Sequence, residues 1–278
     1  MPSRADIPTA VIGGSGLYRL FDPAAAEQLE VSTPFGSAEI SVGTLAGRRV
    51  AFLTRHGAHH SVPPHRINYR ANIWALRSLG VRAIVSSSAV GGISADYPPG
   101  VLVVTDQFID RTHGRADTFF ADASVQHLPA ADPFCPELAT IARRVLREAG
   151  EDFRETGTVV VVQGPRFSTR AESLWYRAAG ADIVNMTLYP EVPLAAELNM
   201  GTVNLSFVTD RDAGVVEATS DPGQESVTSD LVFDRLAAAQ PRIVAAIEAI
   251  VRAIPDDYEP RELIAPAAVD AVLAEAAR

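Results

Sequence analysis

Residues 158–214 read TVVVVQGPRFSTRAESLWYRAAGADIVNMTLYPEVPLAAELNMGTVNLSFVTDRDAG, and this stretch decides the fold. Three apolar runs in it alternate with two segments of helical character. The runs are residues 159–162, 183–184 and 203–208, and the helical segments are residues 168–179 and 191–199. Gly180 is a typical stop for the first helical segment. Alternation of this length predicts a β-α-β-α-β unit with parallel strands in an α/β fold.

Polar residues follow the apolar runs at the points where the predicted strands end. Asn185 and Thr187 follow the second run, and Asp210 and Asp212 follow the third. Parallel strands bring their carboxyl ends to one edge of the sheet, where open α/β sheets bind ligands. We therefore expect these four side chains to meet in one cleft.

Composition limits the class of protein. The chain has 278 residues, 47% of them hydrophobic, so residues 1–278 are long enough for one large α/β domain. No apolar run reaches membrane-spanning length and the amino terminus lacks a signal-peptide pattern, so we expect no membrane partner. The single cysteine, Cys135, fits a reducing, cytoplasmic location. The net charge of −10 argues against a nucleic acid as partner.

The chain contains no lysine, because all 24 of its basic residues are arginine. This absence excludes Schiff-base chemistry, covalently attached pyridoxal phosphate and the lysine of a Walker phosphate loop. Any anion must therefore be bound by arginine, histidine, hydroxyl groups or backbone amides.

Two segments rich in glycine and serine follow predicted strands and are candidates for binding an anion. The first is GGSG at residues 13–16, after a strand at residues 9–12, with the Ser15 hydroxyl as a donor. It matches neither a dinucleotide fingerprint nor a nucleophile elbow, and a plain tight turn is the alternative. The second is SSSAVGG at residues 86–92, which we predict to be a turn after a strand at residues 81–85.

A hairpin within residues 39–54 is predicted to deliver Arg55 and His56 to the same region. An arginine and a histidine directly after a strand suit an oxyanion, with a solvated loop as the alternative. The nearby His59 and His60 raise the possibility of a metal site. Glycine and proline residues around them oppose a regular helix face and no acidic residue is interspersed, so we expect no metal here.

Apolar spacing predicts further helices outside these segments. They cover residues 67–79, 136–149 and 228–239, then a separate helix that begins at Pro241, and a short last helix from Pro266 to about Ala277. The long irregular segment between residues 114 and 136 carries His127, and loops of this length in compact domains are usually functional or disordered. A second irregular stretch is expected at residues 215–224.

Several motifs, in this order along the chain, resemble the trimeric purine nucleoside phosphorylase family and within it the methylthioadenosine phosphorylase branch. The motifs are GGSGL at residues 13–17, TRHG at 54–57, NYRANIWAL at 68–76, DQFIDRT at 106–112, GPRFS at 164–168 with RAES at 170–173, and NMT at 185–187 with PE at 190–191. The likeness extends over about residues 9–235, which is most of the chain.

The resemblance implies phosphorolysis, in which inorganic phosphate attacks the anomeric carbon of a purine nucleoside and releases the free base and a ribose 1-phosphate. The branch implies 5′-methylthioadenosine as the nucleoside. The implied phosphate-binding groups are those of Ser15, Arg55, His56, Ser88, the amide of Ala89, and Thr187. The implied catalytic residues are Asp210 and Asp212, which would face the imidazole and amino edges of the purine. The implied nucleoside-binding residues are Phe167 against the base, Met186 at the ribose hydroxyls, Ser229 near the 5′ substituent, and Asn185, Val232 and His127. No metal and no organic cofactor is implied.

The resemblance also implies an architecture and an assembly. The fold would be a single α/β domain with a mixed central sheet flanked by helices. The assembly would be a homotrimer with sites at the subunit boundaries, and the loop that carries His127 would reach into the neighbour's site.

Two residues predict how this chain selects its nucleoside. Family members that cleave inosine and guanosine typically have asparagine at the position of Asp210, so the aspartate predicts a preference for 6-aminopurines. Ser229 stands where methylthioadenosine phosphorylases usually have an apolar residue, so we expect adenosine to be a usable second substrate.

Four other functions are open alternatives. The nearest is phosphorolysis of 6-oxopurine nucleosides or methylthioinosine. A nucleosidase would use water in place of phosphate, which the retention of Arg55, His56 and Thr187 opposes. A serine hydrolase would use Ser15 or a serine of residues 86–88, but no nucleophile elbow is present. A nonenzymatic nucleoside-binding protein would show no phosphate-dependent release of base.

Overall fold

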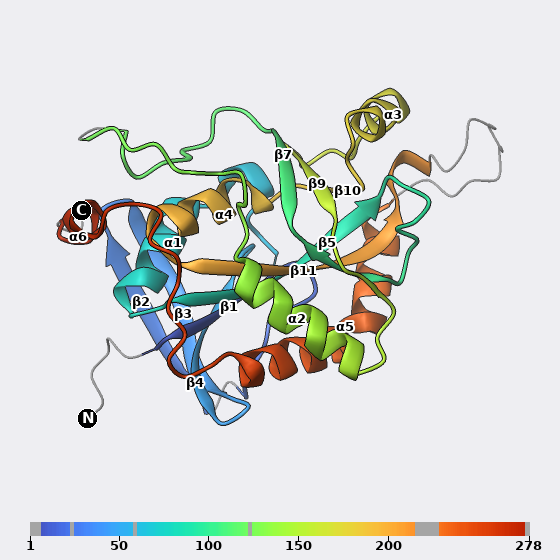
Figure 1. The fold of residues 1–278 in the computed structure, drawn as a ribbon. Helices are drawn as coiled ribbons and strands as arrows, with labels where there is room; N and C mark the ends of the chain where they lie inside the picture. Colours follow the sequence, from blue (N-terminus) through green and yellow to red (C-terminus); the bar gives the residue numbers. More distant parts are fainter. Residues whose placement is uncertain (1–6, 23–24, 58–59, 122–123, 215–227, 276–278) are drawn as a thin grey trace.

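The computed structural model describes residues 7–22, 25–57, 60–121, 124–214 and 228–275. In this part of the chain eleven strands form one mixed sheet with helices on both faces (Figure 1). The strands are β1 Thr9–Gly13, β2 Glu27–Thr33, β3 Gly36–Leu45, β4 Arg48–Thr54, β5 Ala83–Gly92, β6 Leu102–Thr105, β7 Gln107–Arg111, β8 Phe153–Arg154, β9 Thr158–Val162, β10 Ile183–Asn185 and β11 Gly201–Arg211. The helices are α1 Tyr69–Ser78, α2 Pro136–Glu148, α3 Arg170–Ala178, α4 Leu188–Glu197, α5 Ser229–Ala253 and α6 Pro266–Leu273, with short 3-10 turns at Pro64–Arg66 and Asp212–Gly214.

Strand β5 is the centre of the sheet, because three strands pair with it. On one edge, β11 pairs in parallel with residues 83–92, the whole length of β5. On the other edge, β1 pairs with residues 83–86 and β10 pairs with residues 91–92. Among the described residues, no strand therefore pairs with residues 87–90 on that second edge.

The predicted parallel arrangement of residues 158–214 is right for β9 and β10 and wrong for β11. Strand β10 is antiparallel to β5 whereas β11 is parallel to it, so β10 and β11 run in opposite directions. Their polar ends still meet, because Val184 of β10 and Asp210 of β11 both lie opposite Gly91 of β5. The mixed sheet that the family resemblance implied is confirmed.

Residues 86–92 are not the predicted turn, because they form the second half of β5, where β11 continues to pair with them. Their small side chains are needed for close packing. A Cβ atom added at Gly91 would lie 3.0 Å from Oδ1 of Asp210 and 3.1 Å from Cγ1 of Val184. Glycine here allows three strands to converge beside the carboxylates.

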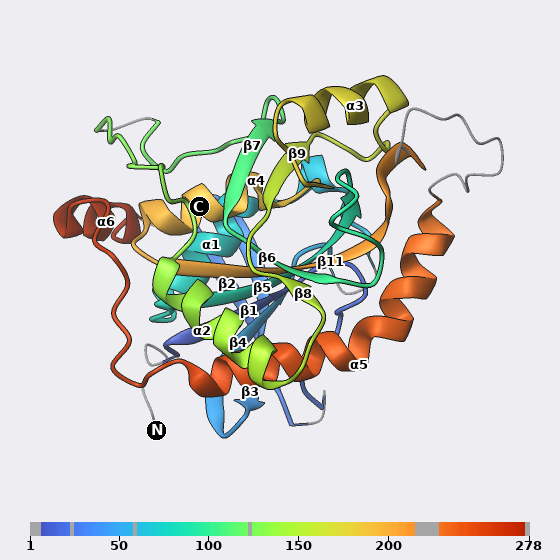
Figure 2. The same cartoon turned by 45° about the vertical axis from the view of Figure 1, so that its right-hand side comes forward.

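Helix α5 continues without a break through Pro241, so the prediction of two helices is wrong. Pro241 is exposed, whereas the opposite face of α5 is buried before and after it. The packing of this face on the core outweighs the local preference of proline for a helix end. Figure 2 shows that α5 changes direction along its length, as helices with an internal proline often do.

The other predicted helices are present with small changes in their ends. Helices α1, α2 and α3 match the predicted segments to within two residues. Helix α4 begins earlier than predicted, and α6 ends at Leu273, short of the predicted end. Ala277 and the stretch at residues 215–224 lie outside the described residues. No described helix is long and apolar enough to cross a membrane.

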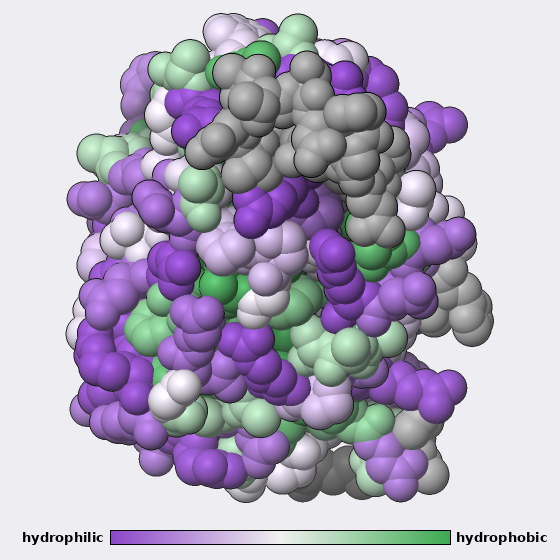
Figure 3. All heavy atoms as spheres, turned by 90° about the vertical axis from the view of Figure 1, so that its right-hand side faces the viewer, coloured by the Kyte–Doolittle hydropathy of each residue, from purple (hydrophilic) through white to green (hydrophobic). Residues whose placement is uncertain are grey.

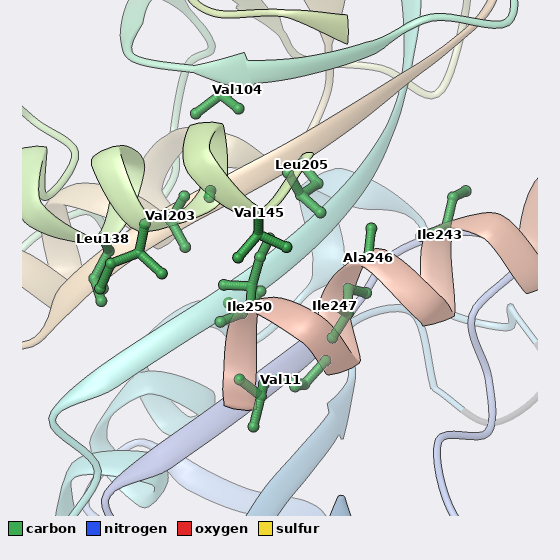
Figure 4. Close-up of a cluster of buried hydrophobic side chains, with 14 of the residues drawn as sticks. Val11, Val104, Leu138, Val145, Val203, Leu205, Ile243, Ala246, Ile247 and Ile250 are labelled. Carbon is green, nitrogen blue, oxygen red and sulfur yellow. The ribbon is translucent and has the colours of Figure 1, made fainter. Parts of the chain in front are cut away.

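Buried apolar side chains form a layer on each face of the sheet. Successive residues of β1 alternate between the layers, because strand side chains point to opposite faces. Val11 packs in the layer under α2 and α5, and Ala10 and Ile12 pack in the layer under α1 and α4. Figure 4 shows the first of these layers, in which side chains of α2 and α5 meet over the strands.

Substitutions on both sides of Pro241 test whether α5 folds as one unit with the sheet. Leu236 and Ile247 are buried in the same apolar layer. Leu236→Ala and Ile247→Ala should each lower the free energy of unfolding by about 3 kcal/mol, because each leaves a cavity in the core. Denaturant titration followed by circular dichroism should show one shifted transition for each variant. Ala238→Ser, on the exposed face, is the matched control and should leave the midpoint unchanged. Separate transitions for the two variants would contradict a continuous α5.

Candidate active site

A cavity of about 320 Å³ lies beside the unpaired edge of β5, a volume suited to a small ligand. All of the predicted site residues except His127 line it: Ser15, Arg55, His56, Ser88, Ala89, Phe167, Asn185, Met186, Thr187, Asp210, Asp212, Ser229 and Val232. His127 is exposed in the loop that precedes α2, away from the cavity of its own chain. Figure 3 shows the face of the molecule on which α3 and the start of α5 lie, where apolar residues interrupt a hydrophilic surface.

The unpaired edge of β5 borders an end of the cavity that is suited to an anion, and we call it the anion-binding end. The carbonyl oxygen of Ser87 accepts a hydrogen bond from Arg55 Nη1 at 2.9 Å, so the backbone of Ser87 faces this edge. Every second residue of a strand turns its N–H and C=O groups to the same edge, so the N–H of Ala89 faces it too. The hydroxyl groups of Ser15 and Ser88 line the same end of the cavity.

Arg55 is fixed by a buried ion pair with Glu191 on α4. Nε and Nη2 of Arg55 donate to the two carboxylate oxygens at 2.6 and 2.7 Å, and both side chains are buried. Burial by itself lowers the pKa of Arg55, but the charge and hydrogen bonds of Glu191, together with Tyr69, outweigh this effect, and the net pKa is raised. A guanidinium has five N–H bonds, and the three that are used among the described residues leave two for a ligand.

His56 is a neutral ring with a defined tautomer. Its Nδ1 lies 2.9 Å from the carbonyl oxygen of Val62, which can only accept, so Nδ1 carries the hydrogen. Burial, with smaller contributions from the charge of Arg55 and from His60, lowers the pKa of His56 to about 4, although the hydrogen bond to Val62 opposes this shift. Nε2 therefore has a free lone pair that can accept a hydrogen bond from a protonated phosphate oxygen or a sugar hydroxyl.

Asn185 holds the turn that leads into α4. Its Oδ1 accepts hydrogen bonds from the backbone N–H of Thr187 at 2.6 Å and of Leu188 at 2.8 Å. These bonds fix Thr187, whose buried side chain lines the cavity. The structure thus gives Asn185 a positioning role, and its contact with a nucleoside stays a prediction.

Two buried carboxylates form the other polar group of the cavity. Burial raises the pKa of Asp210 to about 6, although a 2.6 Å hydrogen bond from the Thr209 hydroxyl to its Oδ2 opposes this shift. Burial also raises the pKa of Asp212. Oδ2 of Asp212 is buried and, within the described part of the chain, accepts no hydrogen bond. A buried acceptor without a partner is costly, so this oxygen is suited to a donor group on a ligand.

Three further residues at the site, Glu191, His60 and Phe233, were not predicted from the sequence. Glu191 was quoted only as part of a motif, although a glutamate inside the apolar segment at residues 190–196 signals a buried partner. His60 and Phe233 line the cavity and pack edge to face with ring centroids 5.2 Å apart. Tyr18 forms a 3.2 Å hydrogen bond with Nδ1 of His60. No sequence pattern indicated this aromatic contact between two distant segments.

Arg115 was also missed, and it holds the segments that follow β9 and β10. Its guanidinium donates to the backbone oxygens of Gln163 at 3.1 Å and Met186 at 3.0 Å, and also to that of Tyr189. These bonds fix the backbone that leads to Phe167 and the backbone on either side of Thr187 relative to each other. Among the described residues, no three potential ligands gather to hold a metal ion, and His59 lies outside that part of the chain.

Comparisons with known proteins identify the family of the chain. The sequence model of the phosphorylase superfamily matches residues 8–252. S-methyl-5′-thioadenosine phosphorylase of Thermofilum pendens is 50% identical over 208 residues, which are 74% of this chain and 79% of the relative. Purine nucleoside phosphorylase of Streptomyces coelicolor is 43% identical over 269 residues, 93% of each chain.

Solved structures share the whole fold. Methylthioadenosine phosphorylase from Schistosoma mansoni, in complex with adenine, superposes with a TM-score of 0.83 at 32% identity over 96% of this chain and 98% of that one. A mutant of the same organism's adenosine/methylthioadenosine phosphorylase, in complex with methylthioadenosine, gives 0.82 at 31% identity over 96% and 97%. From the matched family model, these relatives and the shared fold, we conclude that the chain belongs to the phosphorylase superfamily, with the methylthioadenosine and purine nucleoside phosphorylases.

Proposed function

We propose that this enzyme cleaves the N-glycosidic bond of 5′-methylthioadenosine with inorganic phosphate and produces adenine and 5-methylthioribose 1-phosphate. The observation that carries this proposal is the pairing, in one cavity, of an anion-binding end around Arg55 with the carboxylates of Asp210 and Asp212. The relatives named as methylthioadenosine phosphorylases support the choice of nucleoside. Inorganic phosphate is the co-substrate, and the proposed reaction uses no metal or organic cofactor.

At the anion-binding end, phosphate would be bound by groups that the surrounding structure holds in place. Two free N–H groups of Arg55, the N–H of Ala89, and the hydroxyls of Ser15, Ser88 and Thr187 are its proposed donors. His56 would accept from a protonated phosphate oxygen. Phosphate bound here stabilises the cationic sugar that develops as the glycosidic bond breaks.

At the other polar group, Asp210 would donate its proton to the imidazole edge of the leaving base. Its raised pKa keeps a larger share of it protonated than an exposed aspartate would have. Asp212 would accept from the amino group, which provides the missing partner for its Oδ2. Phe167 would stack on the purine, and Met186 would contact the ribose.

The 5′ substituent would lie near the start of α5. Val232 and Phe233 offer apolar surface there, and Ser229 adds a hydroxyl. We therefore propose adenosine as a second substrate. The second candidate function is phosphorolysis of 6-oxopurine nucleosides. It is supported by the Streptomyces coelicolor relative, which is named purine nucleoside phosphorylase and matches 93% of this chain.

We also propose a cytoplasmic homotrimer in which each site takes a residue from its neighbour. His127 is exposed and lies outside the cavity of its own chain, as a residue that serves another subunit must. The neighbouring Val125 is a large apolar residue with 77% of its surface exposed, which burial against a second subunit would remove from water.

A substrate panel with and without phosphate tests the reaction class. Base release from methylthioadenosine should require phosphate and yield a pentose 1-phosphate, adenosine should react more slowly, and inosine should react least. Chromatography of the products gives all three rates. Arg55→Ala should raise the KM for phosphate far more than the KM for the nucleoside, because the guanidinium faces the anion. Equal turnover without phosphate, with free pentose as product, would rule out phosphorolysis.

Asp210→Asn tests how the base is selected. The variant should lose most activity on methylthioadenosine, because an amide cannot supply the proton, and should gain relative activity on inosine, because the amide can donate to a carbonyl oxygen. The measurement is the ratio of kcat/KM for the two nucleosides in both proteins. Asp230→Asn, an exposed acid at the start of α5, is the matched control. A wild-type preference for inosine would favour the second candidate function instead.

The same variant has a predicted dependence of stability on pH. The pKa of Asp210 is about 6 in the folded protein, compared with 3.8 for an aspartate that is fully exposed to water, so folding favours the protonated form. This contribution is complete below pH 4 and is lost as the pH rises through 6, on the order of 3 kcal/mol in total. Asparagine does not titrate, so the free energy of unfolding of Asp210→Asn minus that of wild type should rise from pH 4 to pH 7. An unchanged difference would show that Asp210 titrates normally.

His127→Ala tests the shared site. Analytical ultracentrifugation should show a trimer for wild type and variant alike. The variant should have a raised KM for the nucleoside and an unchanged KM for phosphate, since His127 would cover the nucleoside from the neighbouring subunit. His113→Ala, another exposed loop histidine, is the matched control. A fully active wild-type monomer would contradict the proposal.

A further inference from the structure

A chain of buried polar side chains crosses three adjacent strands and ends at Ser88. Thr105 on β6, Ser206 and Asn204 on β11, and Ser86 and Ser88 on β5 all lie on one face of the sheet, because strand side chains alternate between faces. Oγ1 of Thr105 lies 2.8 Å from Oγ of Ser206, which donates to Oδ1 of Asn204 at 2.7 Å. Nδ2 of Asn204 donates to Oγ of Ser86 at 2.9 Å and Oγ of Ser88 at 3.0 Å.

All hydrogen bonds in this chain of side chains are donated in one direction, from Thr105 toward Ser88. Ser206 gives its only hydroxyl hydrogen to Asn204, so Thr105 must be the donor in the first bond. The amide of Asn204 then has both N–H groups in use, on Ser86 and Ser88. Ser88 consequently accepts a hydrogen bond from Asn204, and its own hydrogen remains available to a group outside these five side chains.

Within the described part of the protein, the Ser88 hydroxyl accepts a hydrogen bond from Asn204 and donates none. Thr105, Asn204 and Ser206 are completely buried, and Ser88 is the member that lines the cavity at its anion-binding end. Its partner in the chain, Asn204, occupies one of its oxygen lone pairs from the β11 side. An anion in the cavity provides the acceptor that the geometry requires, and a hydrogen bond to a charged group is stronger than one to a neutral group.

We propose that Asn204, supported by Ser206 and Thr105, is a positioning residue that fixes the Ser88 hydroxyl as a hydrogen-bond donor to phosphate. This inference rests on the proposed phosphorolysis. Burial of five polar side chains is unfavourable unless all are hydrogen-bonded, so an apolar set would form a simpler core here. The polar set instead delivers a hydroxyl with one orientation to the anion, without reorganisation when phosphate binds.

Asn204→Leu removes the donor to Ser88 with little change in volume. It should raise the KM for phosphate roughly tenfold, the size expected for a hydrogen bond to a charged group. The KM for the nucleoside should stay unchanged, because the five hydrogen-bonded side chains end at Ser88 and do not reach the base. Ser206→Ala, which deletes one hydroxyl and leaves the amide unanchored, should change the KM for phosphate in the same direction by a smaller factor, and it carries the test if Asn204→Leu does not fold.

Two controls separate positioning from general damage to the sheet. Thr202→Val alters a buried side chain two residues earlier on the same face of β11, outside the chain, and should leave both KM values unchanged. In a Ser88→Ala background, Asn204→Leu should cause no further rise in the KM for phosphate, because Asn204 acts through Ser88. A further rise in that background, or equal rises for phosphate and nucleoside, would overturn the proposal.

Direct titration of inorganic phosphate by calorimetry distinguishes this inference from the proposed function. The positioning role alone would be overturned by one combination of results. In it, wild type binds phosphate and requires it for cleavage, and Asn204→Leu and Ser206→Ala bind phosphate with unchanged affinity. Wild type that cleaves nucleoside without binding phosphate would overturn the proposed function.

Discussion

The site depends on the way that β5 is paired. A strand has two edges, and β11 occupies one of them along the whole of β5. The other edge is divided between β1 and β10, which leaves residues 87–90 without a strand partner within the described structure. Backbone donors in such a gap must find another partner, and a bound anion is a suitable one. The same convergence of strands brings the ends of β10 and β11 to Gly91, so the carboxylates of Asp210 and Asp212 lie beside this gap.

Two arginines, the buried Arg55 and the half-buried Arg115, fix the segments that surround this gap. Arg55 bridges the end of β4 and α4 through Glu191, and Arg115 bridges the segments after β9 and β10 through carbonyl oxygens. A buried ion pair is often neutral for stability, because desolvation of both charges offsets their attraction. Its value here is geometric, since a guanidinium with several bonds has one orientation. Loops that are held in this way can present Phe167 and Thr187 to a ligand without reordering.

Features that depend on neighbouring residues were predictable from the sequence. The polar residues after each apolar run identified Thr187 and Asp210 as members of one cleft, because strand ends are visible in local patterns. The roles given to these residues came from the family resemblance. Features that depend on distant pairing were missed. Glu191 lies 136 positions from Arg55, and no local pattern joins them. Likewise, the direction of β11, the length of β5 and the continuity of α5 through Pro241 are set by tertiary packing, which overrides local preference.

A crystal structure of the enzyme with inorganic phosphate and adenine tests the central claim most directly. We expect phosphate beside the unpaired edge of β5, within hydrogen-bond distance of the Ala89 amide and the Arg55 guanidinium. We expect adenine in the same cavity, stacked on Phe167 with its imidazole edge at Asp210. Phosphate bound elsewhere on the molecule, or adenine bound away from Asp210, would show that the site does not bind its substrates as proposed.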